Sequence, residues 1–568
     1  MEYDIKITGG TLIDGTGAPG KRGDLGIRDG KVVAMGEVKG EAKRTIDATG
    51  MVVSPGFVDI HTHYDAQILW DRMMTISPWH GVTSVVMGNC GFGVAPTRKE
   101  HRELIMRTLE NVEGMSYDAL HAGLGMDWPF ESFPEYLDTI EKMGTAINVG
   151  VLVGHTPIRL YVMGEDATER EATDEEIREM RRLVQESLEA GALGFATSKA
   201  NTHVGFSGKP VPSRAASFDE IRMLADTMRE SHRGIMQATV GKELFHEEFG
   251  QLAKDTGRAV TWTALLSGMG GPGGYKKHLK RTAEMIQEGK HVVPQVTSRP
   301  LNFEIQFSDP FIFASMDVFE PVFKADREGR IAIYKDAAWR EKVKERSGPD
   351  ARSVFQNWCD RTVIAMNPSD PSIEERTVSE VAKERGVHPV DLALDISLEN
   401  DLKTRFRMAV QNFDETEVAE LLKDPNTVIG LSDAGAHASQ LCDACFSTYL
   451  LARWVREKHE LTLEQAVYML TGRPAKLFGL NDRGRLAVGL PADVTVFDPK
   501  TVGPSPLQRV HDLPNNADRL IAEANGIHAV IVNGTLLRLD NKDQLDAKGA
   551  LPGKLLRGQT DEAAAASA

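Results

Sequence analysis

The sequence predicts an α/β protein: a (β/α)8 TIM-like barrel with a small β-sandwich domain formed from both chain termini. Eight short apolar, β-rich runs alternate with longer amphipathic stretches, which is the pattern of repeated βα units. The segments near the two ends have a different texture, in which short alternating strands are broken by glycine turns. Strand after strand ends in a chemically useful residue, as is typical of barrels whose site lies at the carboxyl ends of the strands.

The small β domain is expected to take one part from each end of the chain, residues 1–55 and residues 481–557. Five segments alternate apolar and polar residues and carry Gly or Asp-Gly turns: 3–15, 24–36, 44–56, 484–498 and 526–538. The last residues, 558–568, are small and polar, so we expect a disordered tail there.

The middle of the chain, residues 56–480, is expected to form the barrel. Eight runs are interpreted as its strands: GFVDIHTH (56–63), GVTSVVMGNC (81–90), INVGVLVGH (147–155), ALGFATS (192–198), GIMQATV (234–240), AVTWTAL (259–265), HVVPQVTS (291–298) and TVIGLSDAG (427–435). Helical patterns lie between them, for example at 174–191, 218–232 and 278–289. The positions of the polar residues favour a closed barrel over an open doubly wound sheet.

A large insertion separates the seventh run from the eighth. Connections without secondary structure rarely exceed about 12 to 15 residues, so residues 301–425 must be folded. They contain helical patterns at 376–386 and 415–423 and an aromatic, apolar stretch at 303–323. We expect this insertion to cover the barrel mouth and shape the substrate pocket; the alternative is a peripheral subdomain or an oligomer contact.

Composition limits the class of protein. With 568 residues the chain exceeds the size of one hydrophobic core, about 250 to 300 residues. No apolar run approaches the roughly 18 residues that cross a bilayer, and the first residues lack a secretory signal, so we expect a cytoplasmic protein without a membrane partner. A net charge of −16 disfavours nucleic acid as a partner. Four cysteines are too few for a disulfide framework.

Two histidines end the first predicted strand. Since residues two apart face the same side of a strand, His61 and His63 are expected to reach one cation together. Asp433 ends the last strand, beside the first in a closed barrel, so we expect it to contact the metal and to act as general base; the alternative is a helix cap. Cys90 ends the second strand between glycines, either as a metal ligand or as a small buried residue.

The segments HTHYD, GVTSVVMGNCG, VGH, SDAG and GRLAVGLPADVTVFD resemble the amidohydrolase superfamily, specifically its N-acyl-D-amino-acid deacylase (D-aminoacylase) branch. The resemblance covers nearly the whole chain. It implies a barrel that carries a β-sandwich from both termini, and hydrolysis of an N-acyl bond that depends on zinc, with one or two ions per chain. It also implies that His61, His63 and Cys90 are metal ligands and that Asp433 activates water.

The sequence departs from this family at strands five and six, where the resemblance implies metal-binding histidines. Gln237 and Thr263 or Ala264 stand at those places, and none of them is a strong zinc ligand. Three interpretations stay open: the site holds one metal with the ligands named above and water, metal binding has been lost, or a further residue completes the site. The candidates for that residue are His203, His155 and a carboxylated Lys199.

The substrate is expected to be a small molecule. Hydrolysis of an acylated amino acid requires a cation for the carboxylate and donors for the oxyanion. Arg299 is the first candidate for the carboxylate and Arg214 the second, with Gln237 and Ser298 as further substrate contacts. His155 is expected either to donate a hydrogen bond to the substrate or transition state, as a catalytic residue, or to support the site structurally.

These observations predict a homo-oligomeric hydrolase of carbon–nitrogen bonds other than peptide bonds, acting most simply on an N-acyl-D-amino acid. One alternative is a hydrolase of a cyclic amide, carbamate or ester, because the missing histidines imply a changed pocket. The other is a non-catalytic assembly protein that has lost its metal ligands, which the retention of His61, His63 and Asp433 disfavours.

Overall fold

The structure, a computed structural model, describes residues 2–310, 312–313, 316–351 and 355–561. The chain divides into two compact units. The first comprises Met1–Arg299 and Glu415–Ala568, and the second comprises Pro300–Asp414. Among the described residues, no helix combines the length and the apolar character needed to cross a membrane.

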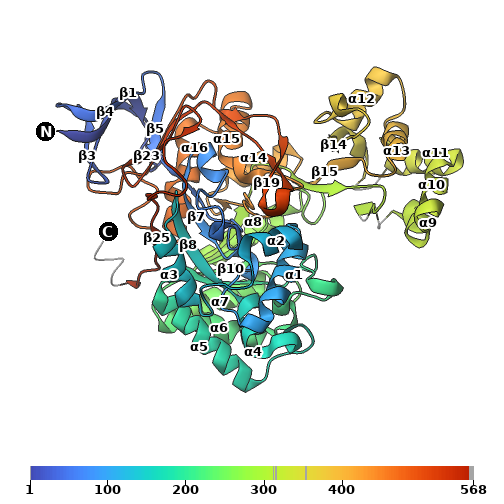
Figure 1. The fold of residues 1–568 in the computed structure, drawn as a ribbon, viewed down its shortest axis with the longest axis horizontal. Coiled ribbons are helices and arrows are strands. Elements are labelled where there is room, and N and C mark those ends of the chain that lie inside the picture. Colours follow the sequence, from blue (N-terminus) through green and yellow to red (C-terminus); the bar gives the residue numbers. More distant parts are fainter. Residues whose placement is uncertain (1, 311, 314–315, 352–354, 562–568) are drawn as a thin grey trace. The chain divides into compact units, whose positions relative to one another are not determined.

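Eight parallel strands form the barrel of the first unit (Figure 1). They are β6 (Phe57–Asp59), β7 (Val82–Met87), β8 (Asn148–Gly154), β9 (Gly194–Ser198), β10 (Ile235–Thr239), β11 (Val260–Thr263), β12 (Val292–Val296) and β16 (Val428–Ile429). Each lies within one of the eight predicted runs. A parallel bridge between Thr62 and Ala434 joins the first strand to the last. The predicted (β/α)8 fold is therefore confirmed.

Helices on the outside of the strands complete the βα units (Figure 1). The helices of this unit are α1 (Arg102–Glu113), α2 (Tyr117–Leu124), α3 (Phe133–Met143), α4 (His155–Met163), α5 (Asp174–Ala190), α6 (Phe218–Glu230), α7 (His246–Thr256), α8 (Tyr275–Gln287), α14 (Glu415–Lys423), α15 (Phe446–Tyr449), α16 (Leu463–Leu470) and α17 (Gly472–Leu477). In α5, Thr173 and Glu176 form a capping box, and Ile177, Met180 and Val184 bury one face in the core. Local sequence thus determines where this helix begins and which face it buries.

Strands from both chain ends share one sheet in the small β domain (Figure 1). Its strands are β1 (Tyr3–Leu12), β2 (Lys21–Arg28), β3 (Lys31–Gly36), β4 (Ala42–Asp47), β5 (Val52–Pro55), β17 (Val494–Phe497), β22 (Ile527–Val532), β23 (Thr535–Leu539) and β24 (Lys542–Asp543). The two ends meet where β5 pairs antiparallel with β17, with Val53 opposite Val496. Both residues are buried in a core that also contains Ile7 and Ile531.

Short strands in the C-terminal part complete the first unit: β18 (Gly503–Pro504), β19 (Gln508–Leu513), β20 (Ala517–Ile521), β21 (Ala524–Asn525) and β25 (Leu555–Leu556). β25 pairs with β8 of the barrel. Beyond it, the backbone N–H of Gly558 donates to the Gly191 carbonyl at 3.0 Å, and Asp561 pairs with Arg258 at 2.7 Å. The described chain therefore includes residues 558–561 of the expected tail, whereas residues 562–568 lie outside the described part, and the disordered tail stays a prediction.

The second unit has its own sheet and core. Its elements are β13 (Leu301–Ile305), β14 (Thr362–Met366), β15 (Arg405–Gln411), α9 (Glu320–Lys324), α10 (Arg327–Lys335), α11 (Ala337–Ser347), α12 (Val378–Arg385) and α13 (Pro389–Glu399). β15 lies between β13 and β14, and both pairings are antiparallel. The aromatic stretch noted in the sequence supplies Phe307, Phe313 and Phe319 to the core of this unit. Its expected role at the barrel mouth stays a prediction.

Candidate metal centre

His61 and His63 lie just beyond the carboxyl end of β6 and are buried. Their backbone is hydrogen-bonded to the segment that follows the last barrel strand. His63 N–H donates to the Ala434 carbonyl at 2.7 Å, and Asp433 N–H donates to the His61 carbonyl at 3.2 Å. The bridge that closes the barrel therefore also brings the histidine pair next to Asp433.

Cys90 lies in a tight turn after β7. Its φ is +57°, and Gly88 and Gly91 on either side also have positive φ. A Cβ at Gly88 would lie 2.1 Å from the Leu152 carbonyl oxygen, so the backbone approaches β8 more closely than any side chain permits. The glycines thus allow the turn to press against the neighbouring strand and hold Cys90 inside the barrel mouth.

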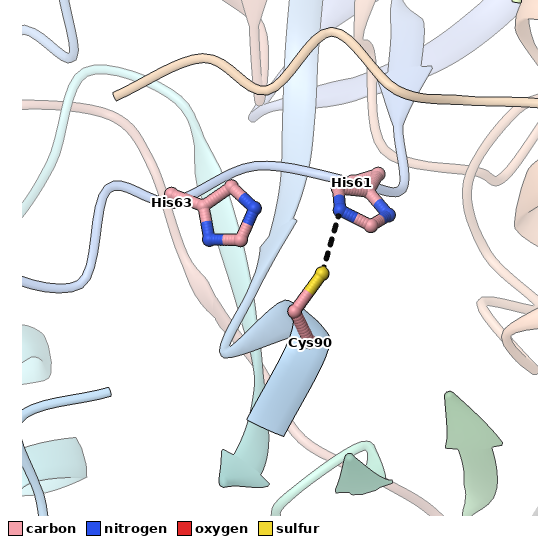
Figure 2. Close-up of side chains that lie close together, drawn as sticks. All are labelled: His61, His63 and Cys90. Carbon is pink, nitrogen blue, oxygen red and sulfur yellow. Dashed lines mark hydrogen bonds between the residues drawn. The ribbon is translucent and has the colours of Figure 1, made fainter. Parts of the chain in front are cut away.

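The side chains of these residues converge on one point (Figure 2). The ligand atoms of His61, His63 and Cys90 all lie within 4.8 Å of one another. Cys90 Sγ is 3.5 Å from His61 Nε2, as the dashed line in Figure 2 marks. Asp433 Oδ1 is 3.3 Å from His61 Nε2 and 3.8 Å from the Nε2 atom of His63. Two imidazoles and a thiol, with the Asp433 carboxylate next to them, form a donor set that suits a zinc-like cation.

The two imidazoles differ in what lies at the other ring nitrogen, Nδ1. Gln295 Oε1, from β12, lies 2.8 Å from His61 Nδ1, so the amide oxygen accepts a hydrogen bond there and leaves Nε2 as the free donor atom for a metal. Glu113 Oε1 lies 3.0 Å from His63 Nδ1. His61 is therefore fixed by a hydrogen bond, whereas His63 has a charged neighbour but no hydrogen bond at Nδ1 among the described residues.

Burial changes the ionisation of the site. Burial, together with the neighbouring His63, lowers the pKa of His61 well below its usual range, so His61 is a neutral ring able to bind a metal. Burial would also lower the pKa of His63, but the Glu113 carboxylate reverses this and raises it well above its usual range. Burial raises the pKa of Asp433 to about 6, although 28% of its side chain is exposed.

His155 lies at the end of β8, but it faces a different cluster. Its Nε2 is 2.9 Å from Glu220 Oε1, and its Nδ1 is 2.8 Å from Thr197 Oγ1. Arg159 also binds the Glu220 carboxylate, and all of these side chains are buried. Both ring nitrogens of His155 are engaged by the protein, which leaves neither available for a substrate in this structure.

His203 is brought near the centre by the loop after β9. Its ring lies 5.0 Å from that of Phe92, whose ring lies 6.4 Å from that of His63. Its Nδ1 pairs with Ser198 Oγ at 2.6 Å. His203 is not among the three side chains whose ligand atoms cluster, so its predicted part in metal binding stays a prediction.

Lys199 holds the same loop. Its ammonium group donates to the carbonyl oxygens of Arg214 at 2.8 Å and Ala216 at 2.6 Å. A carboxylated lysine retains a single N–H and cannot make both bonds. In the structure Lys199 thus ties this loop together, and the interpretation of Lys199 as a carboxylated ligand stays a prediction.

The two predicted arginines have protein partners. Arg299 Nε donates to Asp443 Oδ1 at 2.6 Å, and its guanidinium lies 4.8 Å from the centre of the Tyr449 ring. Arg214 Nη1 donates to the His203 carbonyl at 3.1 Å. Asp443, the partner of Arg299, lines a pocket together with Asp433.

The other two predicted substrate contacts are buried beneath the site. Ser298 Oγ donates to the Phe446 carbonyl at 3.4 Å. Gln237 Oε1 accepts from the backbone N–H of Cys90 at 2.6 Å, while its Nε2 has no hydrogen-bond partner among the described residues. Gln237 thus braces the Cys90 turn from the strand where the family histidine was expected.

Sequence reasoning missed Glu113 and Gln295. Glu113 is the last residue of α1, where an acid opposes the negative end of the helix dipole. An acid at this position of a predicted helix could have indicated a functional residue from the sequence alone. Gln295 occupies an ordinary position in β12, and nothing local distinguishes it.

Comparison with known proteins places this site in context. The model of the Amidohydrolase family matches residues 44–270 and 353–537. The D-aminoacylase of Alcaligenes xylosoxydans xylosoxydans is 30% identical over 544 residues, which cover 94% of each chain.

Two solved structures are similar over 98% of this chain and all of the other. One is a D-aminoacylase with a binuclear metal centre, at 26% identity and a TM-score of 0.66. The other is the N-acyl-D-glutamate deacylase of Bordetella bronchiseptica with zinc and a phosphonate inhibitor, at 27% identity and a TM-score of 0.64. With its barrel, its histidine pair and these matches, the chain belongs to the amidohydrolase family.

Proposed function

We propose that this protein is a metal-dependent amidohydrolase that removes the acyl group from N-acyl-D-amino acids. The observation that carries the proposal is the cluster of His61, His63 and Cys90, whose ligand atoms lie within 4.8 Å of one another beside Asp433. The similarity to D-aminoacylase over 94% of the chain supports the choice of substrate class.

The proposed metal is a single zinc ion. His61, His63 and Cys90 would hold it, with Asp433 beside them, since three protein ligands and a water suffice for catalytic zinc. Gln237 supports one ion rather than two, because its amide oxygen already binds the Cys90 backbone and an amide is a poor zinc ligand. When bound, such an ion supplies Lewis-acid chemistry and lowers the pKa of a bound water toward about 7.

Asp433 is the proposed proton carrier. Its carboxylate accepts a proton from the attacking water as the water oxygen bonds to the acyl carbon. It then gives that proton to the amine nitrogen as the C–N bond breaks, so that the products are a carboxylic acid and a free amino acid. A carboxyl group whose pKa is raised toward neutrality by burial is suited to both transfers.

Recognition of the substrate carboxylate is assigned to Arg299 and Arg214. Arg299 is bonded to Asp443, which lines the pocket that contains Asp433, so a substrate carboxylate would reach Arg299 by sharing or replacing that ion pair. Arg214 is tied to the loop that carries His203.

The test is a substrate panel with zinc-loaded protein: N-acyl-D-amino acids, their L-enantiomers and simple cyclic amides. The proposal predicts hydrolysis of at least one N-acyl-D-amino acid, preferred over its L-form, and no turnover by His61→Ala. Turnover confined to cyclic amides, or to the L-series, would contradict it.

We also propose that the enzyme acts in the cytoplasm as a homo-oligomer. All four cysteines are buried and none forms a disulfide, which suits a reducing compartment. Light scattering after size-exclusion chromatography tests the oligomer, and the mass of a single chain would contradict it.

A further inference from the structure

The buried acid at the end of α1 points to an additional role at the metal centre. Only 6% of Glu113 is exposed, and it is the last residue of its helix. Two effects disfavour a carboxylate there: burial removes its hydration, and the carbonyl groups at the helix C-terminus repel it. A charge in so unfavourable a position needs a compensating partner.

That partner is His63. Glu113 Oε1 lies 3.0 Å from His63 Nδ1, within ion-pair distance, and only 6% of the His63 side chain and 8% of the Glu113 side chain are exposed. The backbone carbonyl of Glu113 accepts a hydrogen bond from His437 N–H. This hydrogen bond fixes the backbone of Glu113, and the Glu113 carboxylate lies on the Nδ1 side of the His63 ring.

His61 shows how a side chain at Nδ1 orients the opposite ring nitrogen, Nε2. Gln295 holds His61 at Nδ1, and the opposite atom, Nε2, lies 3.3 Å from Asp433 Oδ1. At His63 the Glu113 carboxylate lies at Nδ1 at ion-pair distance without a hydrogen bond, and Nε2 lies 3.8 Å from the same Asp433 oxygen. Both rings thus present Nε2 to a common point.

We propose that Glu113 is a positioning residue that acts through His63: its carboxylate attracts the Nδ1 side of the ring and leaves Nε2 facing the metal site. An anion at Nδ1 also makes the imidazole a stronger donor than the neutral amide behind His61 does. This inference rests on the proposed function, because it takes His63 to bind the metal. The site therefore has one imidazole supported by an amide and one supported by a carboxylate.

The experiment measures zinc affinity by competition with a chelator, together with zinc per chain, in purified full-length protein. Glu113→Ala should weaken zinc binding roughly 10 to 100-fold, the usual effect of losing such a partner. Glu113→Gln keeps a side-chain oxygen within reach of His63 but removes the charge, so its zinc affinity should fall less than that of Glu113→Ala. Glu103→Ala removes the same charge from the same helix at a side chain that is 62% exposed, and should bind zinc as the wild type does.

Glu113→Asp keeps the charge but shortens the side chain, so it should bind zinc more weakly than Glu113→Gln if reach to Nδ1 matters. This pair of variants decides the question if Glu113→Ala does not fold. Wild-type affinity in either Glu113→Ala or Glu113→Asp would overturn the inference while the proposed function stands. A wild-type protein that binds no zinc would overturn both.

Discussion

Substitution of His155 tests whether this residue at the barrel mouth stabilises the fold or takes part in catalysis. Replacing it with alanine removes a hydrogen bond to the Glu220 carboxylate, leaves Thr197 Oγ1 without this partner, and opens a cavity between buried groups. A hydrogen bond to a charged group contributes about 1.5 to 3 kcal/mol, and the cavity left by a buried imidazole adds a comparable cost. We therefore expect the free energy of unfolding to fall by about 3 to 5 kcal/mol.

The same change should leave the chemistry largely intact, because neither ring nitrogen of His155 is free to contact a substrate. The assay combines urea unfolding with kcat measured per folded molecule at a temperature where the variant is native. The matched control is His291→Ala, an exposed histidine that should change neither quantity. A kcat that falls about 100-fold or more, with unfolding unchanged, would refute this reasoning and make His155 a catalytic residue.

Three further predictions concern the site and its surroundings. Asp433→Asn should lower kcat by roughly 10² to 10⁴-fold in zinc-loaded protein, because the carbonyl of an amide cannot carry the proton; turnover within tenfold of the wild type would count against Asp433 as the base. Cys90→Ser should weaken zinc binding measured by chelator competition, because a hydroxyl is a poorer zinc ligand than a thiolate, and an unchanged affinity would remove Cys90 from the ligand set. Burial lowers the pKa of His80 to about 4 from 6.5, so the unfolded chain takes up a proton that the folded chain does not. The stabilisation it gives is present above pH 6.5 and is lost as the pH falls toward 4, so between pH 7 and 5 the wild type should lose about 2 kcal/mol more than His80→Gln in urea unfolding; equal losses would contradict this.

The barrel strands were predictable because their signals are local. A run such as GIMQATV is short, apolar and followed by an amphipathic helix, and it forms β10. The position of a strand end also places a side chain at the mouth of a closed barrel. His61, His63, Cys90 and Asp433 could therefore be brought together on paper from their places in the chain alone.

The partners of those residues could not be predicted in the same way. Gln295 is 234 residues from His61 in the chain, and Asp443 is 144 residues from Arg299. No local pattern connects such pairs, because barrel closure and side-chain rotamers decide which groups meet. The same limit applies to His155, whose strand-end position resembles that of a site residue until Glu220, 65 residues away, engages it.

The central claim is that the histidine pair after the first strand holds a catalytic metal. The most direct test measures zinc content and hydrolysis of N-acyl-D-amino acids on the same preparations of the wild type, His61→Ala and His63→Ala. The account predicts about one zinc ion per chain and measurable turnover in the wild type, with both lost in the folded variants. Either variant retaining full turnover, or a wild type that turns over substrate with no bound metal, would contradict it.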